Sequence, residues 1–560
     1  MMRLARRIPR APSRLACLVV VGLACSCGAP PRVADDWIRD LQIQGIEADR
    51  HDVVRWGADP DRYVSWPHHT NRLVPVYTFG TRGAGPGIDL DSYIGANSVY
   101  RDAARLEQRY GRLPQATLDP EAVYLDNTDL ARLQRAALAA GRRYIFVVLF
   151  DGMDWQTARA AAIHRAGDVT YDAGKGIGLH FQDYTAGETA QFGLAVTAPT
   201  DNRTRGRPNT QEVFDSGNGL YGGYDPEQAG SVPWVTGRSA DYVTGSSHGG
   251  SIVHSFTDSA AAATAICAGV KTFNDAVNVD PEGRQLSTVA KEMQTEGFAV
   301  GIVTSVPISH ASVASAYAHN VTRYDYQDLT RDLLGMRSAS HPDRPLPGVE
   351  VLIGCGHGVE REQDSRQGSN FVAGNRYLGD EDLRTIDTAH GGSYVVAVRS
   401  EGVNGAERLA AAAQEAVRSD ERLFGFYGTP YDSGHLPYRT ADGDYEPAPG
   451  YSEPLEVYSE ADLTENPTLA EMTAAALTVL GANERGFWLM VEAGDIDWAN
   501  HDANLDNSIG AVISGDEAVR VITDWVEANS GWDESLLILT PDHGHYLVIE
   551  DPRGLLGPSR

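Results

Sequence analysis

Four apolar runs of strand length in this chain each lead into side chains that bind metal ions. Zinc takes imidazole nitrogen and carboxylate oxygen, whereas magnesium prefers oxygen ligands. Because open α/β sheets place their chemistry at the carboxyl ends of the strands, we expect these side chains to meet at one edge of a sheet. Two metal ions there can stabilise the attacking and leaving oxygens of an in-line displacement. The runs and the side chains that follow them are Tyr144–Phe150 with Asp151; Phe298–Val303 with His310 and Ser312; Phe487–Val491 with Glu492, Asp497 and His501; and Leu536–Leu539 with Asp542 and His543.

Two of these features also have ordinary structural interpretations. Asp497 and His501 are four residues apart, so in a helix they share one face and can chelate one ion. The same pair can be a surface contact worth about 0.3 kcal/mol. Arg323 can be a solvated cation at a helix end, or a planar fork that grips two phosphate oxygens.

A candidate nucleophile lies in the segment FTDSAAAATAICAGVKTFNDAVNVD, residues 256–280. Ser259 opens an alanine-rich stretch that predicts a helix, and Asp258 or Thr257 can cap it. The first-turn N–H groups and the positive end of the helix dipole would then face a phosphate. Taken alone, the pattern is more often that of an ordinary capped helix.

Together these segments resemble the alkaline phosphatase family, in the same order from Asp151 to His543. The resemblance implies an α/β fold of three layers, with a central, mostly parallel sheet flanked by helices and decorated with loop-rich insertions. It also implies two zinc ions and one magnesium ion. Carried over residue by residue, Ser259 is the nucleophile and Arg323 holds the substrate phosphate; Asp151, Asp542 and His543 bind one zinc; Asp497 and His501 bind the other; and His310, Ser312 and Glu492, with Asp151 bridging, surround magnesium.

The function that this resemblance implies is metal-dependent hydrolysis of phosphate monoesters through a phosphoserine at Ser259, with broad specificity and an alkaline pH optimum. A phosphodiesterase on the same fold is an open alternative. A sulfatase is disfavoured because Ser259 is followed by alanines rather than by the Pro-x-Arg setting of that branch. A noncatalytic envelope protein that binds metal or phosphate is the alternative from a different class.

Two features depart from the family pattern. Some members carry Asp, Thr and Lys where this chain has His310, Ser312 and Trp498, and the His and Trp combination resembles other bacterial branches of the family. His310 is expected to act on the third metal through a bridging water, and that site is left open between magnesium and zinc. The family supplies a last zinc histidine several tens of residues beyond its Asp-His pair, but no histidine follows His545 here. We therefore expect the zinc at Asp497 to lack its third protein ligand, with His545 pointing elsewhere, in a truncated chain or a natural short form.

The first 27 residues predict a signal peptide. Five arginines precede the apolar stretch Leu15–Ala24, which is too short to span a bilayer. We therefore expect the protein to be exported to the periplasm, to the medium or to the membrane surface. Cys25 or Cys27 could carry a lipid that attaches the protein to a membrane, although neither has Leu three positions before it.

The remaining chain divides into an extension at 28–140, with a helix expected at Thr128–Ala140, and a catalytic domain at 141–560 that is expected to lack its C-terminal end. A loop-rich insertion at 167–250 is expected to form a cap near the site. His248 and His435 lie in such loops and are expected to be solvated rather than to be ligands.

Composition limits the partners. There are 47 basic and 76 acidic residues, for a formal charge of −29, so the surface should repel nucleic acid. Only Cys267 and Cys355 lie outside the leader, which allows one disulfide at most, and Cys267 is expected to be a small buried apolar residue. Members of the family are often dimers, so a homodimer is one expected assembly.

Overall fold

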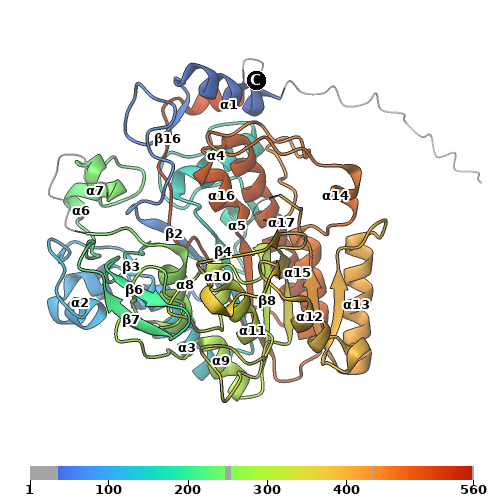
Figure 1. Cartoon of the computed structure of the whole chain (residues 1–560). Helices are drawn as coiled ribbons and strands as arrows, with labels where there is room; N and C mark the ends of the chain where they lie inside the picture. The colour runs from blue at the N-terminus through green and yellow to red at the C-terminus, as the bar shows by residue number, and fades with distance from the viewer. Residues whose placement is uncertain (1–35, 246–253, 432–433, 558–560) are drawn as a thin grey trace, which may run out of the picture. The chain divides into compact units, whose positions relative to one another are not determined.

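A ten-stranded sheet runs through the part of the chain that the structure, a computed structural model, describes: residues 36–245, 254–431 and 434–557 (Figure 1). From β12 to β15 all neighbours are parallel. At the other edge β2 is antiparallel to both β15 and β5. The strands lie in the order β12 (Tyr394–Val398), β13 (Arg422–Phe426), β9 (Val351–Cys355), β8 (Ala299–Pro307), β14 (Phe487–Ala493), β4 (Tyr144–Phe150), β15 (Ser535–Thr540), β2 (Val74–Phe79), β5 (Gln191–Val196) and β3 (Leu125–Asp126).

Helices cover both faces of this sheet, which is why its central strands are mostly apolar. In β4, Phe146, Val148 and Phe150 pack into one hydrophobic cluster, and the alternate residues Ile145 and Val147 pack into another. The predicted three-layer α/β class is confirmed. The first cluster contains residues of α4 (Trp155–Ala166), α13 (Gly405–Ser419), α15 (Leu469–Leu480) and α17 (Leu505–Asn529); the second contains residues of α3 (Thr128–Ala139), α8 (Ser259–Ala268), α9 (Val289–Thr295) and α11 (Tyr326–Leu333).

The predicted strands and helices lie close to the observed ones. β4 has the predicted bounds, whereas β8 begins one residue later than predicted and continues to Pro307. β14 continues through Glu492, so this carboxylate projects from the strand itself. The helix that would bring Asp497 and His501 to one face is α16 (Asp495–His501).

The 28–140 and 167–250 regions both contribute strands to the central sheet. β2 and β3 come from the first region and β5 comes from the second. The first region also holds β1 (Val54–Trp56), which pairs antiparallel with β16 (Leu547–Ile549) near the other end of the chain. Residues Trp37–Arg560 form one compact unit.

Several predictions from the sequence fall on residues that the structure does not describe. The signal peptide with Cys25 and Cys27 is among them, and so is His248. Within the described residues, Cys267 and Cys355 are both buried and free, so no disulfide joins them. No helix in the described ranges has the length and apolar character needed to cross a membrane.

Candidate active site

The carboxyl ends of four neighbouring parallel strands bring the predicted metal-binding side chains together. β8, β14, β4 and β15 are consecutive in the sheet. Asp151 directly follows β4, and Asp542 and His543 follow β15 after one intervening residue. Glu492 lies near the end of β14. All four side chains are fully buried.

Asp151, Asp542 and His543 form the first group, and their ligand atoms all lie within 4.8 Å of one another. His543 Nε2 is 3.3 Å from Asp151 Oδ1 and 3.4 Å from Asp542 Oδ2. The Gly152 N–H donates to Asp542 Oδ1 at 3.2 Å. Gly152 has φ +71° and a Cβ there would lie 2.9 Å from the Cα of Asp497, so only glycine allows α16 to approach the end of β4 this closely.

Asp151, His310 and Glu492 form a second group within the same distance limit. The Ser312 hydroxyl donates to Asp151 Oδ2 at 3.1 Å, which brings the fourth predicted side chain to this group. Thr304 of β8 donates its hydroxyl to Glu492 Oε2 at 2.5 Å. The sequence interpretation missed Thr304, although a hydroxyl residue in an apolar strand was a usable signal.

His310 is a neutral imidazole with one unused nitrogen. Its Nε2 accepts a hydrogen bond from Arg323 Nη2 at 3.2 Å. Burial, and then the charge of Arg323, lowers the pKa of His310 to about 3. Because Nε2 is the acceptor, Nδ1 carries the ring proton, and Nδ1 is buried without a hydrogen-bond partner.

Asp497 is the centre of a third group that contains more histidines than predicted. His501 Nε2 and His69 Nε2 each lie 3.5 Å from Asp497 Oδ1. His545 Nε2 lies 2.8 Å from the same oxygen. The predictions that His545 points elsewhere and that Asp497 and His501 lack a third protein partner are therefore wrong.

His69 reaches this group because β2 runs antiparallel to β15. In the register of the two strands Leu537 pairs with Phe79 and Leu539 with Tyr77, so the amino end of β2 lies at the carboxyl end of β15. The pairing continues beyond the strands, where the Thr70 N–H donates to the Gly544 carbonyl at 2.9 Å. A histidine just before an apolar run was visible in the sequence, but the direction of that strand was not.

Two of these imidazoles are oriented by backbone carbonyls. His69 Nδ1 is 2.9 Å from the Thr257 carbonyl and His501 Nδ1 is 2.9 Å from the Pro67 carbonyl. Each ring therefore donates through Nδ1 and presents the lone pair of Nε2, an arrangement typical of metal-binding histidines. The two Nε2 atoms lie only 3.0 Å apart. Two lone pairs at that distance repel unless a proton or a metal ion lies beside them.

The candidate nucleophile lies against the first group. Ser259 is the first residue of α8, and Asp258 caps the helix by accepting from the Ala261 N–H at 3.0 Å. Ser259 Oγ is 3.2 Å from His543 Nε2. Arg323 Nη1 donates to Asp258 Oδ2 at 3.1 Å, so the arginine lies beside the helix end that carries the serine.

The ionised forms of Asp151 and Glu492 are disfavoured unless positive charge lies nearby. Burial, together with Asp542, Asp497 and Glu492, raises the pKa of Asp151 well above its usual range. Burial raises the pKa of Glu492 to about 7. Asp151 Oδ1, Glu492 Oε1 and Asp542 Oδ2 have no hydrogen-bond partner. Because buried oxygens are normally paired, these three atoms and the mixed oxygen and nitrogen donor set fit divalent metal ions.

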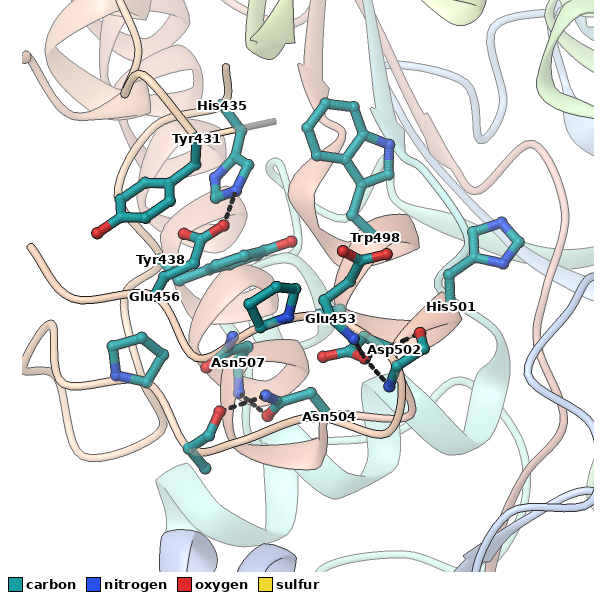
Figure 2. Close-up of a pocket in the computed structure, with 16 residues that line it drawn as sticks. Tyr431, His435, Tyr438, Glu453, Glu456, Trp498, His501, Asp502, Asn504 and Asn507 are labelled. Atoms are coloured by element: carbon teal, nitrogen blue, oxygen red, sulfur yellow. Dashed lines mark hydrogen bonds and ion pairs between the residues drawn. The ribbon is translucent and has the colours of Figure 1, made fainter. Parts of the chain in front are cut away.

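A cavity of about 320 Å³ opens beside α16 (Figure 2). Trp498 and His501 line it from α16, and His435, Tyr438 and Glu456 line it from the segment before α15. His435 is buried, so the expectation that it is solvated is wrong. Its Nε2 pairs with Glu456 Oε1 at 3.0 Å, and it is absent from the three metal-binding groups. The Trp498 ring lies 5.4 Å from the His310 ring between centroids. The cavity therefore borders the centre at His501 and Trp498.

Comparisons with known proteins find one family. The model of the family described as alkaline phosphatase matches residues 233–554. Alkaline phosphatase 4 of Bacillus subtilis is 27% identical over 52% of this chain and 50% of its own length. The alkaline phosphatase of Escherichia coli is 28% identical over 53% of this chain and 59% of its own length. The chain thus spans between half and three fifths of these two relatives.

Among solved structures, the alkaline phosphatase of Thermus thermophilus covers 72% of this chain and 60% of its own chain at 24% identity, with a TM-score of 0.41. Asp151 and His69 lie outside the residues that the family model matches.

Proposed function

Because the chain belongs to the alkaline phosphatase family, we propose that it hydrolyses phosphate monoesters with Ser259 as the nucleophile. The observation that carries this proposal is the position of Ser259 at the amino end of α8, with Oγ 3.2 Å from His543 Nε2. Arg323 lies beside the same helix end through its ion pair with Asp258. The proposed nucleophile, the proposed phosphate-binding cation and the candidate metal-binding groups thus lie at one buried edge of the sheet.

The proposed metal content is two zinc ions and one magnesium ion. Bound there, the ions would lower the pKa of the serine hydroxyl and stabilise the leaving oxygen. His310 would donate from Nδ1–H to a magnesium-bound water rather than bind the metal directly, since its Nε2 accepts from Arg323. The proposed ligands are Asp151, Asp542 and His543 for one zinc; Asp497, His501, His69 and His545 for the other; and Asp151, Ser312 and Glu492 for magnesium.

The protein's own groups account for the rest of the mechanism. Ser259 Oγ forms a bond to phosphorus while the ester oxygen leaves, which gives phosphoserine. Water then breaks the new bond, releasing inorganic phosphate and restoring Ser259. The N–H groups of the first turn of α8 and the guanidinium of Arg323 would hold the nonbridging oxygens in both steps. Asp258 orients Arg323 for this task by accepting from Nη1.

The cavity beside His501 gives the alcohol part of the substrate room to bind, which supports broad specificity. The same space favours one alternative, a phosphodiesterase, because a second ester group could occupy it. Rates on an aryl phosphate and on the matching methyl aryl diester would distinguish the two. A monoesterase predicts a faster rate on the first substrate, and the alternative predicts the reverse.

The proposal is tested by measuring hydrolysis of a chromogenic aryl phosphate near pH 9 with added zinc and magnesium, before and after chelation. We expect turnover that chelation abolishes and that Ser259→Ala lacks. Wild-type turnover by Ser259→Ala would exclude the proposed nucleophile. Stoichiometric binding of zinc and phosphate without turnover would favour the noncatalytic alternative.

Export, attachment to a membrane through a lipid on Cys25 or Cys27, and assembly into a homodimer stay predictions from the sequence and from the family resemblance.

A further inference from the structure

A second cluster of buried metal-binding side chains lies apart from the candidate active site. It consists of His319, Asp332 and His341, whose ligand atoms lie within 4.8 Å of one another. His319 follows α10 (Ala311–Ala314), Asp332 belongs to α11, and His341 lies in the loop after α11. His319 and Asp332 are fully buried, and the side chain of His341 is only 10% exposed.

The ring of His319 has one nitrogen with no partner. Its Nε2 lies 2.8 Å from the Leu286 carbonyl, which can only accept a hydrogen bond. Burial, and then the charge of Lys291, lowers the pKa of His319 to about 3, so the ring is neutral and has a single proton. That proton is on Nε2, which leaves a lone pair on Nδ1. Nδ1 is buried without a hydrogen-bond partner, although His319 is only 1% exposed.

The other two side chains are held in place beside it. His341 Nδ1 lies 2.9 Å and 3.1 Å from the two carboxylate oxygens of Asp332. The backbone N–H of His319 donates to Asp332 Oδ2 at 2.9 Å, and the Ser338 hydroxyl donates to Asp332 Oδ1. The rings of His319 and His341 are 5.0 Å apart between centroids. Two imidazoles and a carboxylate are thus gathered with secondary hydrogen bonds, as in many metal sites.

We propose that His319, Asp332 and His341 bind a divalent metal ion of the zinc class as a structural site. Two imidazole nitrogens and one carboxylate oxygen suit zinc and its neighbours better than magnesium or calcium, and water can complete a four-coordinate shell. His341 must give up its Nδ1 proton, or present its other nitrogen, when the ion binds.

The site would brace the segment that carries the phosphate-binding arginine. His319 lies four residues before Arg323 in the chain, and α11 begins three residues after it. An ion shared by His319, Asp332 and His341 ties this segment to α11 and to the loop that follows. The Ser340 hydroxyl already joins that loop to the same segment by donating to the His319 carbonyl at 2.6 Å.

The competing explanation is an ion-pair cluster that needs no metal. In it, His341 Nδ1 donates a hydrogen bond to Asp332, and Lys291 of α9 supplies the nearby positive charge. Burial lowers the pKa of Lys291, and the charge of Asp332 opposes that shift. The two explanations predict different effects of removing Lys291 on metal affinity. Loss of a competing cation should tighten metal binding if a metal site exists.

The test uses the full chain, stripped with a chelator and then titrated with zinc or cobalt. We expect wild-type protein to bind one more equivalent than His341→Ala, and the cobalt absorption bands of one tetrahedral site to disappear in that variant. His341→Gln keeps the side-chain volume and should lose the same equivalent. Lys291→Met should bind the extra equivalent at least about 10-fold more tightly.

His390→Ala is the matched control, because His390 also pairs with an aspartate, Asp387 at 3.3 Å, but its side chain is 54% exposed. It should keep the wild-type stoichiometry. Equal zinc content and equal affinity in wild type and both His341 variants would overturn the proposal. Loss of an equivalent in His390→Ala as well would show adventitious surface binding and overturn it too. Neither readout depends on phosphatase activity.

Discussion

Replacing Asp325 by Asn should stabilise the protein, and more so at alkaline pH. Burial, and then the charge of Asp328, raises the pKa of Asp325 from 3.8 to about 7. One oxygen, Oδ2, accepts from Asn320 Nδ2 at 3.0 Å and from Asn370 Nδ2 at 2.7 Å. The other, Oδ1, has no hydrogen-bond partner. An amide keeps the accepting oxygen and places a neutral NH₂ where the second oxygen was.

The sign and size of the stabilisation follow from the pKa of Asp325 in the folded state and its ordinary value in the unfolded state. Because the folded-state pKa is the higher one, the favourable contribution of this carboxyl is complete below about pH 3.8 and is lost as the pH rises through about 7. Relative to low pH, this buried carboxyl costs the folded state about 4 kcal/mol at pH 9, where it is ionised. At pH 5 it costs about 1.6 kcal/mol, because the carboxyl stays protonated in the folded state but is already ionised in the unfolded state. The Asp325→Asn variant avoids this cost, so its melting temperature should exceed that of wild type by about 4 °C at pH 9 and by about 1.5 °C at pH 5.

Scanning calorimetry at the two pH values measures this difference. The amide does not titrate, so any gain or loss in its hydrogen bonding is the same at pH 5 and pH 9. The difference between the two melting-temperature shifts therefore measures the effect of ionising Asp325. Asp61→Asn is the control, because the side chain of Asp61 is 83% exposed and pairs with Arg50 only at 3.6 Å. It should shift the melting temperature little at either pH. A stabilisation by Asp325→Asn that is equal at pH 5 and pH 9 would refute the reasoning.

Three further outcomes are expected. Arg323→Ala should lower kcat/KM on an aryl phosphate by about 100- to 1,000-fold with unchanged zinc content, since it removes a preorganised donor to the phosphate; an unchanged kcat/KM would contradict the role of Arg323. Thr304→Val removes the hydroxyl that orients Glu492 and should weaken magnesium binding by about 10- to 100-fold in a titration followed by activity, with Thr304→Ser as the near-wild-type control. Ser312→Ala should raise the magnesium concentration needed for half-maximal rate, and equal requirements in variant and wild type would remove Ser312 from the site.

The sheet and most of the centre could be predicted because each signal was local. A continuous apolar run such as 144–150 indicates a strand buried on both faces, and parallel strands place the residues that follow them at one edge. The i,i+4 spacing of Asp497 and His501 needed only a helix, and α16 supplies it. The chemistry of helix amino ends left Asp258 or Thr257 as the cap of α8, and the structure uses Asp258.

What the sequence did not reveal depended on pairing between distant segments. His69 lies before the apolar run of its strand, whereas the other site residues lie at or after the ends of theirs. It reaches the centre only because β2 is antiparallel to β15. Nothing local specifies that direction. His545 was expected to point away from His543, its neighbour two residues earlier, but the stretch after β15 turns both rings toward Asp497, with Nε2 at 3.8 Å for His543 and 2.8 Å for His545.

The central claim is that the segment before β2 supplies a ligand to the metal at Asp497. The most direct test is the zinc content and aryl phosphatase rate of His69→Ala beside His68→Ala, which changes the adjacent, exposed histidine. We expect His69→Ala to lose one tightly bound zinc equivalent and most of its turnover, while His68→Ala keeps both. A His69→Ala protein with full zinc content and wild-type turnover would contradict the account.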